Sequence, residues 1–181
     1  RSTRDGKPGL SNSDPLGRAV ADRYAGTLNE VLRDAIPNRH ARTEAKFLDA
    51  GGAFVASEGT DPDRERHRVV DWDGYANGLS VLGELQAKRQ VRASLVVSTA
   101  DEATHAIADL VDAAGRRAVV VVPDGADVAR FADYLEMHLG SGVARLTGDQ
   151  PTATRYESFL RVRSGAATVV VGTRNSVFAP V

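Results

Sequence analysis

The sequence contains no cysteine, which excludes disulfide bonds and thiolate metal sites from its 181 residues. Its histidines are scattered and lack the spacing of metal ligands. They are His40, His67, His105 and His138. We therefore expect no metal and no other cofactor in this part of the protein.

Long hydrophobic runs are also missing. No apolar stretch approaches the length of about 20 residues that a membrane helix needs, and the polar start, Arg1 to Gly9, does not have the pattern of a signal peptide. We expect a cytoplasmic protein without a membrane partner. The chain begins with Arg and stops shortly after a strand-like segment, so we interpret it as an internal piece of a longer protein.

Charge of one sign is not in excess. The 23 basic and 24 acidic residues give a net charge of −1, so the chain as a whole is not attracted to nucleic acid and any DNA contact must be local. The hydrophobic fraction of 42% and the charged fraction of 26% are typical of a folded globular protein.

Helix signals dominate the first third of the sequence. Asp14 and Pro15 begin a predicted helix that ends near Gly26, and the capping box Thr27-Leu28-Asn29-Glu30 begins a second that ends at Pro37. The pair resembles a helix-turn-helix, which the basic run Arg39-His40-Ala41-Arg42 favours, although a hairpin of helices that only pack is the open alternative. We predict a small helical domain over residues 14–56, after a cut or disordered end at 1–13.

A polar stretch separates this part from the rest. Residues 57–68 contain Gly and Pro and show no apolar period, which predicts a linker over 57–71. Trp72 follows and is expected to anchor the core of the second domain, and Tyr75 to Arg89 is predicted to be a helix.

Strands and helices alternate regularly from Arg92 onward, which predicts an α/β fold with a parallel sheet over residues 72–181. Each helix is followed by a glycine suited to a helix end: Gly115, Gly140 and Gly165. The predicted strands are 93–98, 118–122, 143–147 and 167–171, and the predicted helices are 100–114, 126–139 and 152–163.

The loops that follow the strands should carry the function of such a sheet. The first loop contains Ser98, Thr99, Ala100 and Asp101, and has neither the glycines nor the lysine that cradle a triphosphate. Thr99 and Glu102 instead form a capping box, so we expect no nucleotide site here. The sequence contains no dinucleotide fingerprint, nucleophile elbow or metal-binding helix motif, and we predict no catalytic residues.

The later loops differ in how strongly they indicate a function. Pro123 and Asp124 follow the second predicted strand, and Asp149 follows the third; both aspartates are good helix N-caps. The fourth loop, Gly172 to Pro180, combines small residues, the hydroxyls of Thr173 and Ser176, and the charge of Arg174. That combination suits a phosphodiester backbone, whereas the structural alternative is a plain turn.

Two motifs together resemble a known family. Ala118-Val119-Val120-Val121-Val122-Pro123-Asp124 and Gly172-Thr173-Arg174-Asn175-Ser176-Val177-Phe178-Ala179-Pro180 are similar to motifs in the first helicase lobe of primosomal protein N′, the PriA replication restart family. The stretch from Arg155 to Gly165 and the helix pair from Ala19 to Leu28 resemble the family as well.

This resemblance implies a partial RecA-like helicase lobe preceded by a winged-helix-like DNA-binding domain. It implies DNA contacts at Thr173, Arg174, Ser176, Pro123 and Asp124. Expected partners are forked and single-stranded DNA, single-strand-binding protein, and primosome and helicase-loading proteins. The family's zinc site would lie outside this sequence.

The loop at Ser98 to Asp101 departs from the family because its ATP-binding residues are absent, as in a short branch with a degenerate ATPase site. We therefore expect a replication-restart protein that recognises stalled or forked DNA without hydrolysing ATP. Two alternatives are an active ATP-dependent 3′–5′ DNA helicase and a regulatory receiver-like domain that uses Asp124.

Overall fold

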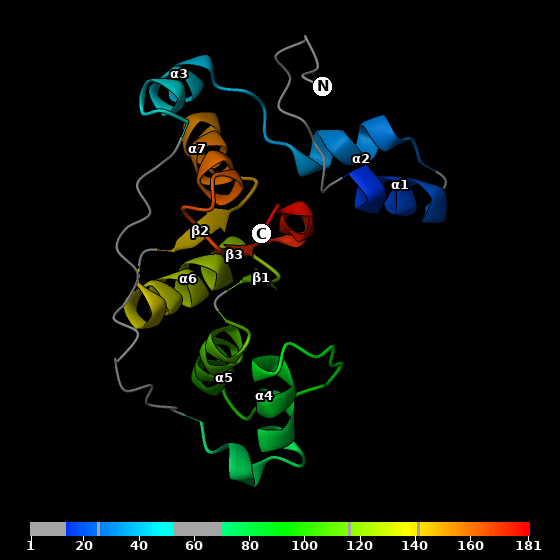
Figure 1. The fold of residues 1–181 in the computed structure, drawn as a ribbon, viewed down its shortest axis with the longest axis vertical. Coiled ribbons are helices and arrows are strands. Elements are labelled where there is room, and N and C mark those ends of the chain that lie inside the picture. The colour runs from blue at the N-terminus through cyan, green and yellow to red at the C-terminus, as the bar shows by residue number, and fades with distance from the viewer. Residues whose placement is uncertain (1–13, 25, 53–69, 116, 141) are drawn as a thin grey trace.

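The computed structural model describes residues 14–24, 26–52, 70–115, 117–140 and 142–181 (Figure 1). Helices alternate with a small parallel sheet in the second half, as predicted. The elements are α1 (Asp14–Arg23), α2 (Leu28–Ala35), α3 (Ala41–Asp49), the 3₁₀ helix η1 (Trp72–Gly74), α4 (Gly78–Gln86), α5 (Ala100–Ala113), β1 (Ala118–Val121), α6 (Gly125–Leu139), β2 (Val143–Leu146), α7 (Thr152–Arg163), β3 (Val169–Gly172) and the 3₁₀ helix η2 (Arg174–Phe178).

The sheet has three parallel strands in the order β1-β3-β2. Three consecutive valines of the central strand, Val169, Val170 and Val171, are at most 2% exposed. Since neighbouring side chains of a strand point to opposite faces, both faces of the sheet must be covered. Val169 and Val171 pack with residues of α6, and Val170 packs with Val162 of α7, so these two helices enclose β3.

The prediction of a strand over residues 93–98 is wrong. The backbone of residues 91–97 is not paired in the described sheet, which begins at β1. Leu95 packs against the cluster around Trp72 and Leu82, whereas Val96 is 85% exposed. Leu95 therefore contacts the helices and not a neighbouring strand, and a strand cannot persist without a partner.

Trp72 anchors a cluster below the sheet, as predicted. It is 4% exposed, and its indole Nε1 donates a 2.8 Å hydrogen bond to Asp109 of α5. Leu82 of α4 and Ala106 of α5 complete this cluster. The helix predicted over Tyr75 to Arg89 is shorter in the structure: α4 begins only at Gly78, after Asn77 in the left-handed conformation, and ends at Gln86.

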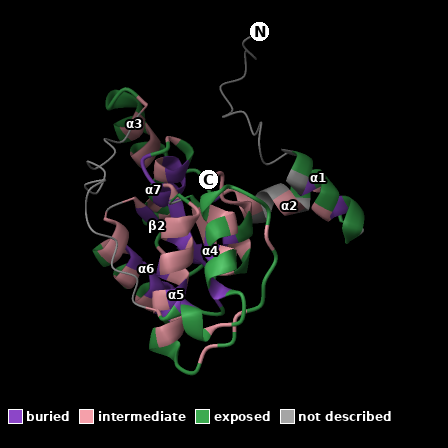
Figure 2. Cartoon of the chain, turned by 60° about the horizontal axis from the view of Figure 1, so that its bottom comes forward, coloured by how far each residue is buried: buried purple, intermediate pink, exposed green. Residues whose placement is uncertain are grey.

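The first three helices lie around the upper part of the sheet domain (Figure 1). α1 and α2 pack on each other, and α2 also contacts η2, whereas α3 packs on α7. The hydroxyl of Tyr156 donates a 3.1 Å hydrogen bond to Glu44, which fastens α3 to α7. Figure 2 shows that α1 and α3 are mostly exposed, whereas buried residues gather around α5, α6 and α7.

Parts of the predicted domain division lie outside the described residues, namely 1–13 and most of the linker at 57–71. The division at 14–56 and 72–181 stays a prediction. Among the described residues, no helix combines the length and the hydropathy that crossing a membrane requires.

Gly172 sets how closely β3 approaches its neighbours. A Cβ atom at this position would lie 2.3 Å from the carbonyl oxygen of Leu146 and 2.6 Å from the Cβ of Ser176. Any side chain would therefore push β2 or η2 away. We expect Gly172→Ala to lower the free energy of unfolding by about 1–3 kcal/mol, the usual cost of overpacking, in a urea titration.

Gly83→Ala is the matched control. A Cβ at Gly83 meets nothing within 4 Å, and this residue lies inside α4. Replacing glycine by alanine in a helix interior stabilises it by up to about 1 kcal/mol. Equal effects of the two substitutions would contradict the steric argument.

Candidate nucleic-acid interface

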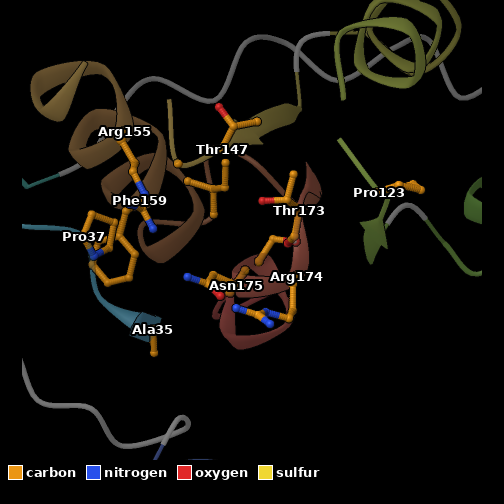
Figure 3. A pocket seen from close by; sticks show the side chains of 13 residues that line it. Ala35, Pro37, Pro123, Thr147, Arg155, Phe159, Thr173, Arg174 and Asn175 are labelled. Atoms are coloured by element: carbon orange, nitrogen blue, oxygen red, sulfur yellow. The ribbon is translucent and has the colours of Figure 1, made fainter. Parts of the chain in front are cut away.

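The carboxyl ends of the three parallel strands meet at one edge of the sheet, and their loops surround a cavity of about 400 Å³ (Figure 3). The loop after β1 contributes Pro123, the loop after β2 contributes Thr147 and Gly148, and the turn after β3 contributes Thr173 and the start of η2. Two helices also contribute, through Ala35 of α2 with the following Pro37, and through Arg155 and Phe159 of α7. Leu146 at the end of β2 and Ala179 after η2 complete the lining.

Four of the five predicted DNA-contacting residues line this cavity: Pro123, Thr173, Arg174 and Ser176. Arg174 is exposed, and its guanidinium has no hydrogen-bond or ion-pair partner within the described ranges. Its charge is therefore free to meet an anion at the rim of the cavity.

Ser176 has a structural role in this turn. It is 2% exposed, and its hydroxyl donates a 2.7 Å hydrogen bond to the carbonyl oxygen of Thr173. The amide of Ser176 donates to the same carbonyl at 2.8 Å. Ser176 thus shapes the turn that presents Arg174.

Asp124 does not line the cavity. It is the N-cap of α6, as predicted, and its Oδ1 accepts a 2.9 Å hydrogen bond from the amide of Asp127. Its carboxylate therefore serves the helix start.

Asp149 is not the N-cap of α7, and this prediction is wrong, because the N-cap is Pro151. A hydrogen bond from the Thr147 side chain holds the pKa of Asp149 below its ordinary value of 3.8. The amide of Thr147 also donates to Gln150 at 3.0 Å, so these side chains hold the β2–α7 loop together.

Sequence reasoning gave no binding role to several residues of the cavity lining, among them Pro37, Arg155, Phe159 and Asn175. Arg155, Phe159 and Asn175 lie in the segments that carry the family resemblance, but only the fold brings them to one site. The side chains of Arg155 and Asn175 have no hydrogen-bond partner in the described part of the chain. The cavity therefore holds, after Arg174, a second cation that has no partner among the described residues.

The turn before α5 is a closed cap. Thr99 is the N-cap and accepts a 3.1 Å hydrogen bond from the amide of Glu102. The Glu102 carboxylate accepts a 2.8 Å hydrogen bond from the amide of Ser98 and another from the hydroxyl of Tyr75. The predicted capping arrangement is present, with Ser98 as the partner of Glu102. None of Ser98, Thr99, Ala100 and Asp101 lines the cavity.

The hydrogen bond from Tyr75, and next that from Ser98, lower the pKa of Glu102 from its ordinary value of 4.5. A lowered pKa in the folded state means that the ionised carboxylate stabilises the fold above pH 4.5 and that this contribution disappears as the pH falls through the lowered pKa. We expect Glu102→Gln to lower the urea midpoint at neutral pH. The difference from the wild type should shrink as the pH falls through that range.

Asp101→Asn is the control, because Asp101 is exposed and has no hydrogen-bond partner within the described ranges. It should shift the midpoint less than Glu102→Gln at neutral pH. A gap between wild type and Glu102→Gln that stays constant down to acid pH would contradict a role for the ionised carboxylate.

Comparison with known proteins identifies relatives of one kind. The chain is 38% identical over 170 residues to the probable replication restart protein PriA of Mycobacterium tuberculosis, which covers 90% of this chain and 24% of the relative. It is 35% identical over 170 residues to the probable replication restart protein PriA of Mycobacterium leprae, with 90% of this chain and 25% of the relative covered.

No protein-family model matches the chain, and no solved structure matches it significantly. The chain spans about a quarter of the length of the curated relatives it matches. The stretch of similarity covers most of this sequence. The chain is therefore homologous to part of the PriA replication restart protein, as its motifs predict.

Proposed function

We propose that this chain is the DNA-binding region of a replication-restart protein that recognises stalled or forked DNA and supports primosome assembly without hydrolysing ATP. The observation that carries the proposal is the guanidinium of Arg174, which has no partner in the described part of the chain and lies at the carboxyl edge of the sheet, in a chain homologous to PriA. DNA contact by a nearly neutral chain requires a local cation of this kind.

The chemistry of the rim suits a phosphodiester. Arg174 supplies charge, the half-buried Thr173 supplies a hydroxyl, and Gly172 keeps the turn close to the sheet. Arginine donates to phosphate oxygens through a planar fork, and such contacts position a strand without reading its sequence. The expected binding is therefore strong in its salt dependence and weak in its base preference.

The proposal includes a partial RecA-like lobe for the sheet and a winged-helix-like role for the helices before it. The partners we propose are forked and single-stranded DNA, single-strand-binding protein, and primosome and helicase-loading proteins, all in the cytoplasm. A zinc site, where the whole protein has one, would be formed by residues outside this sequence.

The start of α5 supports binding without hydrolysis. Its amides at Ser98 and Glu102 are already bonded to side chains, and the carboxylates of Asp101 and Glu102 add negative charge. A triphosphate needs free amides and a cation at such a turn, so it would be repelled here. A lobe of this kind can act as a platform for DNA and protein partners.

Removing the charge of Arg174 tests the DNA contact. We expect Arg174→Ala in the full-length protein to weaken binding of single-stranded and forked DNA about uniformly across sequences. The slope of log K against log salt concentration should become shallower by roughly 1, the share of one phosphate contact. Fluorescence anisotropy with labelled DNA at several salt concentrations measures both quantities.

Arg92→Ala is the matched control, because Arg92 is also exposed but does not line the cavity. It should leave the affinity and the salt slope nearly unchanged. An unchanged slope in Arg174→Ala, or an equal change in both variants, would remove Arg174 from the interface.

The second expectation concerns nucleotide turnover. The purified protein should show no magnesium-dependent ATP hydrolysis, with or without forked DNA, because the α5 turn has no lysine and its Ser98 and Glu102 amides already donate to side chains. Release of labelled phosphate from ATP measures this. DNA-stimulated turnover that disappears when this turn is mutated would favour the alternative of an active helicase.

A further inference from the structure

The cavity beside Arg174 is larger than a backbone contact needs. Its volume of about 400 Å³ falls in the range of roughly 300–1,000 Å³ that is typical of sites for small molecules. A phosphodiester that only touches Arg174 and Thr173 at the rim would leave this space to solvent. The cavity therefore has room for a larger chemical group attached to the phosphate.

The walls of the cavity differ in character (Figure 3). Phe159, Pro37 and Leu146 are apolar residues of the lining. Arg155, Arg174 and Asn175 supply polar groups with no hydrogen-bond partner among the residues the structure describes. Asn175 points from η2 toward Phe159 and Pro37.

A nucleotide combines the same two kinds of surface. Its base has flat apolar faces and a polar edge, and its phosphate is an anion. Aromatic side chains support bases of single strands irrespective of sequence, and an asparagine amide can donate to and accept from a base edge. The two arginines match the phosphates on either side of the sugar.

We infer that this cavity is a subsite for one whole nucleotide of a DNA single strand, with the base inside against Phe159 and Pro37 and the phosphate at Arg174. This inference rests on the proposed function and adds a binding site for the base to the proposed phosphate contact. Asn175 faces the base edge, and Arg155 neutralises the second phosphate.

The subsite also joins two parts of the chain. Ala35 is the last residue of α2, and Pro37 lies just after it. The other lining residues named here come from the sheet edge, η2 and α7. Because α2 contacts η2, a base held in the cavity contacts the N-terminal helices and the sheet domain together. The helix pair thereby takes part in DNA binding through its end.

Gly148 allows the cavity to be narrowed without disturbing its frame. It lines the cavity, it is exposed, and a Cβ placed on it meets no atom within 4 Å. Gly148→Leu should therefore occupy part of the space while Arg155 and Arg174 stay in place. Gly83→Leu adds the same side chain at an equally open glycine in α4, which does not line the cavity.

The experiment compares two strands of equal length, a normal oligonucleotide and one in which every base is replaced by an abasic site. With the wild-type full-length protein, the normal strand should bind about tenfold more tightly, because supporting one base contributes an effect of that order. The difference should nearly vanish in Gly148→Leu and persist in Gly83→Leu. Asn175→Ala, which leaves the cavity open, should reduce it in part.

Each outcome decides between the claims. Equal affinity of both strands for the wild type, or a difference that Gly148→Leu leaves unchanged, would overturn the base subsite while the Arg174 contact stands. If the wild-type protein binds neither strand, the proposed function itself is overturned. Free deoxyadenosine monophosphate should compete only at concentrations far above those of the strand, and competition at equal concentration would assign the cavity to a free nucleotide.

Discussion

Burial of β3 on both faces is the constraint on which the arrangement of this domain depends. The side chains of its consecutive valines are shielded from solvent only because α6 covers one face of the sheet and α7 covers the other. The same requirement brings Arg155 and Phe159 of α7 to the carboxyl end of β3, where Gly172 turns the chain into η2. The same helix packing that buries β3 thus also positions the residues of the candidate site.

Electrostatics favours an anion site at the cavity. Some arginines elsewhere are paired, such as Arg145 with Asp133 and Glu136, and Arg89 with Glu84. Exposed pairs of this kind add little to stability, and they also cancel the charge that would attract nucleic acid. Arg155 and Arg174 keep theirs, so an overall charge of −1 is compatible with a local anion site.

Sequence patterns predicted the sheet domain where the signal was local. The strands at β1, β2 and β3, the cap by Asp124, the buried Trp72 and the helix ends with positive φ at Gly115, Gly140 and Gly165 all follow from short-range chemistry. The false strand at 93–98 and the missed helix α3 depended on long-range contacts, of Leu95 with Trp72 and of Glu44 with Tyr156. The cavity was missed for the same reason, because Pro37 and Phe159 meet only in the folded chain.

The cap on α5 bears on what a lobe of this shape can do. A motor changes its grip on DNA because nucleotide binds one conformation better than another, and a ligand shifts an equilibrium only by its difference in affinity between the two. At the start of α5, the side chains of Glu102 and Thr99 accept hydrogen bonds from the amides of Ser98 and Glu102, and Tyr75 donates to Glu102. Under the proposed function the affinity of the sheet edge for DNA is then set by the strand alone, which suits a protein that marks a site rather than one that travels along it.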